Sequence, residues 1–99
     1  MQIKWLNPDV SFSKLILAGD IGGTNTNLAI VGELGGYFTI ILEVVYPSAD
    51  IDGLIGPLKE VLSIAKERRS DLIPSVCCIS AAGAVVNNRC NLTNCTWSI

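Results

Sequence analysis

Short apolar runs separated by glycine pairs dominate the first half of the chain. The runs at residues 14–18 and 27–31 are too short for helices, and a glycine pair at 22–23 lies between them. Such a connection is typical of a β-hairpin. A second glycine pair, at 35–36, precedes a run rich in β-branched and aromatic residues over 37–46. The pattern therefore predicts three strands joined as a meander.

The apolar spacing becomes helical after this meander. One apolar stripe comprises Leu54, Leu58, Val61, Leu62 and Ala65. Because proline disrupts a helix interior, Pro57 is expected at the first helical position, with the helix running from about Gly56 to about Arg69. Residues 75–80 then form a fourth strand, which the crossover helix makes parallel to its sheet neighbour. The pattern predicts an α/β fold of order β-β-β-α-β with a mixed sheet.

The two ends of the chain carry weaker patterns. Residues 1–13 match no recognisable element and are expected to form an N-terminal extension. Residues 84–99 are rich in Asn and Thr and are typical of turns and short extended pieces. With 99 residues in all, the chain has room for one small domain at most.

The composition is unusually apolar for so short a chain, at 49% with a mean hydropathy of +0.47. Two explanations fit: a sheet covered on both faces, or apolar surface that meets a partner. No stretch reaches the roughly 18 apolar residues that a membrane helix needs. We therefore expect no membrane partner.

The charge pattern argues against a nucleic-acid surface. The formal net charge is −2 and the pI is about 4.8, whereas binding a phosphate backbone needs clustered Lys and Arg. The one basic cluster, Lys66 with Arg68 and Arg69, lies at the expected helix end, where cations complement the helix dipole. The N-terminus makes a poor signal peptide, so we expect a cytoplasmic protein.

Four cysteines, Cys77, Cys78, Cys90 and Cys95, raise the question of a zinc site. Zinc ligands usually come in close pairs such as C-x₂-C, and the chain has no histidine. Neighbouring residues of a strand point to opposite faces, so Cys77 and Cys78 could not bind one ion together. The pattern favours buried, reduced thiols over zinc.

Chemistry-bearing residues gather at the first glycine pair. Asp20, at the end of the first strand, offers a carboxylate that can bind Mg²⁺ directly or through water. Gly22 and Gly23 let backbone N–H groups approach an anion, and Thr24 adds a hydroxyl donor. This arrangement suits a phosphate with its metal ion. A glycine hairpin whose Asp only caps the turn fits these residues equally well.

The string from Asp20 to Asn25, Asp-Ile-Gly-Gly-Thr-Asn, resembles the first phosphate motif of bacterial and archaeal glucokinases. These enzymes belong to the sugar kinase, Hsp70 and actin superfamily. Two further segments, Ala-Gly-Ala-Val at 82–85 and Leu-Thr-Asn-Cys-Thr-Trp at 92–97, are similar to later motifs of the family in the same order. Ala84 stands where the family usually has proline, and Asn27 where many members have arginine. The resemblance covers residues 14–99.

The resemblance implies a ribonuclease H-like, actin-like ATPase fold, in which the fourth predicted strand lies beside the first. Residues 14–99 would form part of the N-terminal domain of a sugar kinase that phosphorylates glucose, or a similar hexose, with ATP and Mg²⁺. Asp20 would hold the metal, and Thr93 and Asn94 would line the sugar site; packing of Trp97 and turn capping by Asn94 fit that segment equally well. The implied cofactor-binding residues are Gly19, Asp20, Ile21, Gly22, Gly23, Thr24 and Asn25.

The same resemblance places the general base of glucokinases, an aspartate of an Asn-Asp pair, beyond residue 99. No catalytic residue is therefore assigned, and we expect the 99-residue chain to be inactive alone. A non-catalytic, actin-like nucleotide-binding or interaction module remains an alternative. If the strand at 75–80 lacks an outer neighbour, its open edge predicts self-association.

Overall fold

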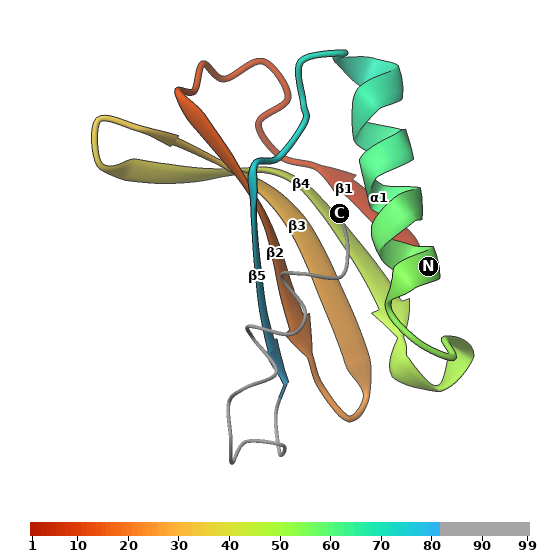
Figure 1. The fold of residues 1–99 in the computed structure, drawn as a ribbon. Helices are drawn as coiled ribbons and strands as arrows, with labels where there is room; N and C mark the ends of the chain where they lie inside the picture. Colours follow the sequence, from red (N-terminus) through yellow and green to blue (C-terminus); the bar gives the residue numbers. More distant parts are fainter. Residues whose placement is uncertain (82–99) are drawn as a thin grey trace.

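The computed structural model describes residues 1–81, which form a five-stranded sheet with one long helix against it (Figure 1). The elements are β1 (Gln2–Trp5), β2 (Lys14–Ile21), β3 (Asn25–Leu34), β4 (Tyr37–Pro47), the 3₁₀ turn η1 (Ser48–Asp50), α1 (Ile55–Arg68) and β5 (Val76–Ala81). The expected α/β class is confirmed, and so is the order of three strands, a helix and a further strand from residue 14 onward.

The strands follow the order β1-β4-β3-β2-β5, and β5 runs parallel to β2 while the other neighbours are antiparallel. The expected mixed sheet, with the last strand beside the first strand of the meander, is therefore confirmed. Ile21 of β2 pairs with Ala81 of β5. Consequently β5 ends level with the β2–β3 turn, at the lower end of the sheet in Figure 1.

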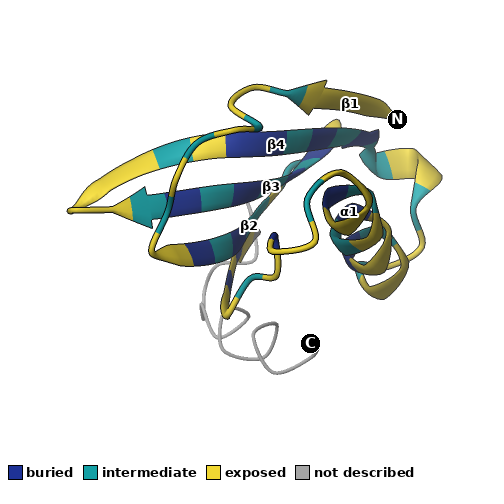
Figure 2. Cartoon of the chain, turned by 90° about the horizontal axis from the view of Figure 1, so that it is seen from above, coloured by how far each residue is buried: buried dark blue, intermediate teal, exposed yellow. Residues whose placement is uncertain are grey.

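The hydrophobic core lies between one face of the sheet and α1, as the view from above shows (Figure 2). Alternate residues of each strand point to this face, because side chains of a strand alternate between its two sides. The buried set includes Leu15 and Leu17 of β2, Leu28 and Ile30 of β3, Val44 and Tyr46 of β4, Cys77 and Ile79 of β5, and Leu58, Val61 and Ala65 of α1. Cys77 is buried and Cys78 is exposed, as expected for adjacent strand residues on opposite faces, so the expectation of buried thiols is wrong for Cys78.

Helix α1 begins slightly earlier than expected, at Ile55, so that Pro57 is its third residue. The first four N–H groups of a helix have no partner within it, so a proline here costs no hydrogen bond. The Tyr46 hydroxyl donates to Oε1 of Glu60 over 2.7 Å and joins β4 to the first half of the helix. Burial, followed by this hydrogen bond and the Glu60 charge, raises the pKa of Tyr46.

The N-terminal segment contains a strand that the sequence pattern does not predict. Residues Gln2–Trp5 pair with the outer edge of β4, from Gln2 opposite Val45 to Trp5 opposite Leu42. Four residues are too few to show a clear alternation, and the edge of β4 supplies the partner. The guanidinium of Arg68 lies 4.9 Å from the centre of the Trp5 ring, which ties β1 to the end of α1.

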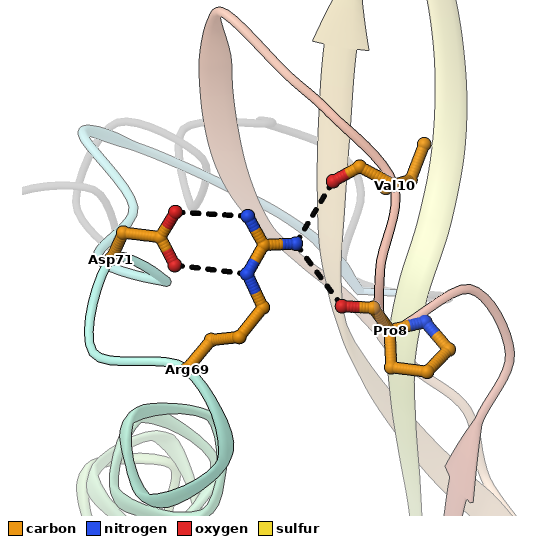
Figure 3. A network of polar contacts seen from close by, with 4 residues as sticks. All are labelled: Pro8, Val10, Arg69 and Asp71. Carbon is orange, nitrogen blue, oxygen red and sulfur yellow. Dashed lines mark hydrogen bonds and ion pairs between the residues drawn. The ribbon is translucent and has the colours of Figure 1, made fainter.

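Arg69 binds the rest of the N-terminal segment, between residues 8 and 12 (Figure 3). Its Nε and Nη2 donate to the two carboxylate oxygens of Asp71 over 3.0 and 2.9 Å. Its Nη1 donates to the carbonyls of Pro8 and Val10 over 3.1 and 2.9 Å, and its guanidinium lies 5.1 Å from the centre of the Phe12 ring. The basic cluster thus does more than complement the helix dipole, because Arg69 fastens the N-terminal segment to the helix end.

The second glycine pair forms the β3–β4 turn at the opposite end of the sheet. Gly35 and Gly36 have φ of 60° and 85°, in the left-handed region that favours glycine. The turn fixes Leu34 opposite Tyr37, whose side chain is 80% exposed. Within residues 1–81, no helix is both long and apolar enough to cross a membrane.

Candidate functional site

The β2–β3 turn, residues 22–24, is closed by a hydrogen bond from the N–H of Gly22 to the carbonyl of Asn25 over 2.9 Å. A Cβ on Gly22 would lie only 2.9 Å from that same carbonyl oxygen, so close backbone approach requires glycine there. A Cβ on Gly23 would have no atom within 4 Å, which leaves open space beside the backbone. Neither glycine has a positive φ, so the backbone conformation of the turn does not itself require glycine. Glycine is required at position 22 by the close backbone approach, and at position 23 it leaves open space beside the chain.

Ser48, the first residue of η1 after the end of β4, stabilises this turn with two hydrogen bonds. Its backbone N–H donates to the carbonyl of Thr24 over 2.9 Å, and its hydroxyl donates to the carbonyl of Gly22 over 2.7 Å. The hydroxyl of Thr26, which is fully buried, lies 2.9 Å from Oγ of Ser48. Because Ser48 has one hydroxyl proton and a carbonyl can only accept, Thr26 is the donor in that pair.

The turn presents backbone N–H groups to the outside. Gly23 and Thr24 are both exposed. In the part of the chain that the structure describes, neither N–H has a hydrogen-bond acceptor. The N–H of Gly22 is already bonded to Asn25 and is therefore not offered to a ligand. Two successive unpaired N–H groups in an exposed turn suit an anion such as phosphate.

Asp20 lies two residues before the turn, on the sheet face away from α1. Its directly opposed neighbours on that face are Asn27 of β3 and Ser80 of β5. Oγ of Ser80 donates to Oδ1 of Asp20 over 3.5 Å, and the carboxylate is exposed. The structure therefore places the predicted metal-binding carboxylate beside the turn with a free side toward solvent.

A magnesium ion fits Asp20 as the single protein carboxylate among its ligands. Within residues 1–81, no group of three or more His, Cys, Asp or Glu side chains could hold a metal ion. Mg²⁺ keeps several waters and commonly takes one or two carboxylates together with phosphate oxygens. Asp20 suits an ion of that kind, held mainly by water and phosphate.

Gly19 and Ile21 belong to the opposite face of β2. A Cβ on Gly19 would lie 2.8 Å from Cδ1 of Ile79 and 3.0 Å from Cδ2 of Leu28, so its missing side chain makes room for the core. Ile21 is partly buried against the same core. Both residues support the site through packing, whereas Asp20, Gly23, Thr24 and Asn25 are exposed at or near the turn.

The remaining predicted site residues, Thr93 and Asn94, lie outside the described residues, as do the motif at 82–85 and Trp97. Ser48 and Thr26 were not predicted. They are 22 residues apart, and no local motif marks a serine and a threonine whose contact depends on the length of β4. The one available signal was the position of Ser48, which lies two residues after the end of the predicted third strand.

Comparison with known proteins places these observations in a family. A glucokinase family model matches residues 17–99. The chain is 40% identical over 85 residues to a glucokinase of Nostoc punctiforme, covering 84% of this chain and 24% of that protein. It is 31% identical over 91 residues to a glucokinase of Mesorhizobium japonicum, covering 92% of this chain and 25% of that protein.

The chain thus spans about a quarter of the length of the curated relatives that it matches. No solved structure matches it significantly. The family match includes the β2–β3 turn, the crossover helix and β5, while β1 lies before it. On the extent of that match, the chain belongs to the glucokinase family.

Proposed function

We propose that this chain is the N-terminal segment of an ATP-dependent, cytoplasmic glucokinase and supplies its first phosphate-binding turn. The observation that carries the proposal is a pair of exposed residues beside the Asp20 carboxylate, Gly23 and Thr24, whose N–H groups have no hydrogen-bond acceptor within residues 1–81. Membership of the glucokinase family supports ATP as the phosphate source and glucose, or a similar hexose, as the acceptor.

Each residue has a distinct role in this proposal. The N–H groups of Gly23 and Thr24 hold phosphate oxygens, and the Thr24 hydroxyl adds a donor from the same turn. Asp20 holds Mg²⁺ through water, in line with its exposed position. Bound ATP and Mg²⁺ would supply the phosphoryl group and the countercharge that sugar phosphorylation needs. Thr93 and Asn94 are proposed to contact the sugar, on the family resemblance alone.

Calorimetric titration of the 99-residue chain with ATP, with and without Mg²⁺, tests the site. We expect Mg²⁺ to tighten ATP binding to the unchanged chain. Asp20→Ala should remove this dependence on Mg²⁺ while leaving the weaker, metal-free binding in place. Asp52→Ala, which removes an exposed carboxylate from the segment before α1, serves as the matched control. Equal Mg²⁺ dependence in the Asp20→Ala and control variants would count against the metal role of Asp20.

We also propose that the 99-residue polypeptide does not phosphorylate glucose by itself. Phosphoryl transfer needs a base placed to accept the hydroxyl proton of the sugar. Among residues 1–81, Glu60 near the start of α1 already accepts a hydrogen bond from the Tyr46 hydroxyl, so its carboxylate is engaged within the fold. A coupled assay should detect no glucose 6-phosphate, and its ATP-dependent formation by the purified chain would refute the proposal.

Self-association is proposed as a second property of this polypeptide. Within residues 1–81, β5 has β2 as its single sheet neighbour, so one row of its backbone groups faces outward. An open strand edge favours pairing with another chain. Static light scattering should give a mass above that of the monomer, 10.6 kDa, and a monomeric mass at high concentration would contradict the proposal.

A further inference from the structure

We propose that Ser48 is a positioning residue for phosphate: together with Thr26 it sets the direction of the Gly23 N–H group in the β2–β3 turn. This rests on the proposed function, since it concerns the same turn. Ser48 does not touch the phosphate itself. It acts through the two carbonyls on either side of Gly23, those of Gly22 and Thr24.

Peptide geometry links the Ser48 hydroxyl to the N–H of Gly23. A trans peptide is planar, and its C=O and N–H point in opposite directions. The carbonyl of Gly22 accepts from Oγ of Ser48 over 2.7 Å and is therefore directed toward that residue. The N–H of Gly23, in the same peptide unit, must point away from Ser48. The hydrogen bond thus fixes the orientation of one of the two proposed phosphate donors.

The backbone of Ser48 controls a second group. Its N–H donates to the carbonyl of Thr24 over 2.9 Å, which occupies that oxygen. A carbonyl oxygen free to turn toward a bound phosphate would repel it, because both carry negative charge. Ser48 therefore holds two acceptors in place, one by its hydroxyl and one by its backbone.

Thr26 gives the Ser48 hydroxyl a fixed direction. Thr26 is fully buried, and its hydroxyl donates to Oγ of Ser48 over 2.9 Å. With that lone pair occupied, the proton of Ser48 is directed to the carbonyl of Gly22. The backbone of Ser48 is itself held, because its carbonyl accepts from the N–H of Ile51 over 3.4 Å in η1. A chain of hydroxyls thus connects the buried sheet to the exposed turn.

The matched test compares Ser48→Ala with Ser13→Ala. The Ser13 hydroxyl also donates to a backbone carbonyl, that of Glu33 over 3.1 Å, but at the opposite end of the β2–β3 pair. We expect nitrogen-15 relaxation to show order parameters near 0.85 for Gly23 and Thr24 in the unchanged chain and below about 0.6 in Ser48→Ala. Ser13→Ala should leave both values unchanged.

Phosphate binding is measured on the same samples by titration with ATP and Mg²⁺, following the amide signal of Gly23. Loss of one hydrogen bond predicts roughly three- to tenfold weaker binding for Ser48→Ala. Ser48→Thr, which keeps the hydroxyl, should restore binding to within about twofold of the unchanged chain. Thr26→Val, which keeps the side-chain shape, should weaken binding in the same direction and provides a second variant should Ser48→Ala fold poorly.

The relaxation measurements and the ATP titrations together distinguish failure of the Ser48 role from failure of the proposed function. If the Gly23 signal of the unchanged chain does not respond to ATP with Mg²⁺, the proposed function is refuted, and with it any role of Ser48 in phosphate binding. If the unchanged chain binds but Ser48→Ala and Thr26→Val keep an ordered turn and full affinity, the role of Ser48 is refuted and the proposed function stands. Reduced order together with weaker binding, restored in Ser48→Thr, supports the proposal.

Discussion

The two adjacent glycines of the turn should respond in opposite ways to the same added methyl group. A Cβ on Gly22 would meet the carbonyl oxygen of Asn25 at 2.9 Å, whereas a Cβ on Gly23 would meet nothing within 4 Å. Gly22→Ala therefore perturbs the turn itself. Gly23→Ala leaves the turn intact and fills the space in which we propose that phosphate lies. Comparing the two variants therefore distinguishes an effect on folding from an effect on phosphate binding.

The structure sets the expected size of each effect. The Asn25 oxygen is backbone and also accepts the N–H of Gly22, so Gly22→Ala must open the turn. Overpacking of this kind costs about 1–3 kcal/mol, and weakening the hydrogen bond adds about 1 kcal/mol. Gly23 has no positive φ, so alanine fits its backbone and restricts the unfolded chain. Such a change stabilises a protein by about 0.4–1 kcal/mol.

Thermal unfolding followed by circular dichroism measures the first effect, since 1 kcal/mol shifts the Tm of a domain of this size by about 4–8 °C. We expect Gly22→Ala to lower the Tm by roughly 8 °C or more and Gly23→Ala to leave it unchanged or slightly raised. Calorimetry should then show clearly weaker binding of ATP with Mg²⁺ to Gly23→Ala. Binding by Gly23→Ala as tight as by the unchanged chain would refute the placement of phosphate beside Gly23.

Three further predictions concern the surrounding fold. Arg69→Lys keeps the charge but loses the fork that joins Asp71 to the carbonyls of Pro8 and Val10, so amide hydrogen exchange in residues 6–13 should become faster; unchanged exchange would contradict the anchoring role of Arg69. The raised pKa of Tyr46 means that its protonated hydroxyl, bonded to Glu60, stabilises the fold below about pH 10 and that this contribution is lost as the pH rises further. Urea unfolding at pH 8 and 11 should show this loss, and a smaller one in Tyr46→Phe. Leu17→Ala, at a fully buried position, should cost about 2–5 kcal/mol in urea unfolding, and a cost under 1 kcal/mol would contradict the core assignment.

Local patterns in the sequence were sufficient to predict the meander, the crossover helix and the last strand. The glycine pairs mark both turns, and the apolar stripe marks α1, because each signal lies within a few neighbouring residues. Asp20 was predicted beside the turn for the same reason. The family resemblance, not the pattern, supplied the position of β5 beside β2.

What the sequence did not predict depends on contacts between distant segments. β1 has four residues and becomes a strand only because β4 offers an open edge. Ser48 and Thr26 belong to no local motif, and only the folded sheet brings their hydroxyl oxygens to 2.9 Å from each other. Arg69 was interpreted as a helix-end charge, and its bonds to the N-terminal segment span about sixty residues of sequence. Such partners carry no local signature.

The register of β4 explains how Ser48 comes to stand beside the turn. The β3–β4 turn sets Val31 opposite Ile40, and continuing that register for seven residues would place Pro47 opposite Thr24. Proline has no N–H to donate. The pairing instead shifts by one residue, so that Ile30 lies opposite Leu42 and Ile41 is the extra residue of a bulge.

This shift also decides which side chains of β4 enter the core. With the bulge, Leu28 faces Val44 and Thr26 faces Tyr46, and all four are buried. Without it, Leu28 would face Glu43, because a slip of one residue turns every side chain to the other side of the sheet. The hydrophobic pattern of β4 therefore enforces the bulge, and the bulge in turn brings an N–H and a hydroxyl to Thr24 and Gly22. Core packing at the centre of the sheet thereby sets the geometry of the proposed phosphate site at its end.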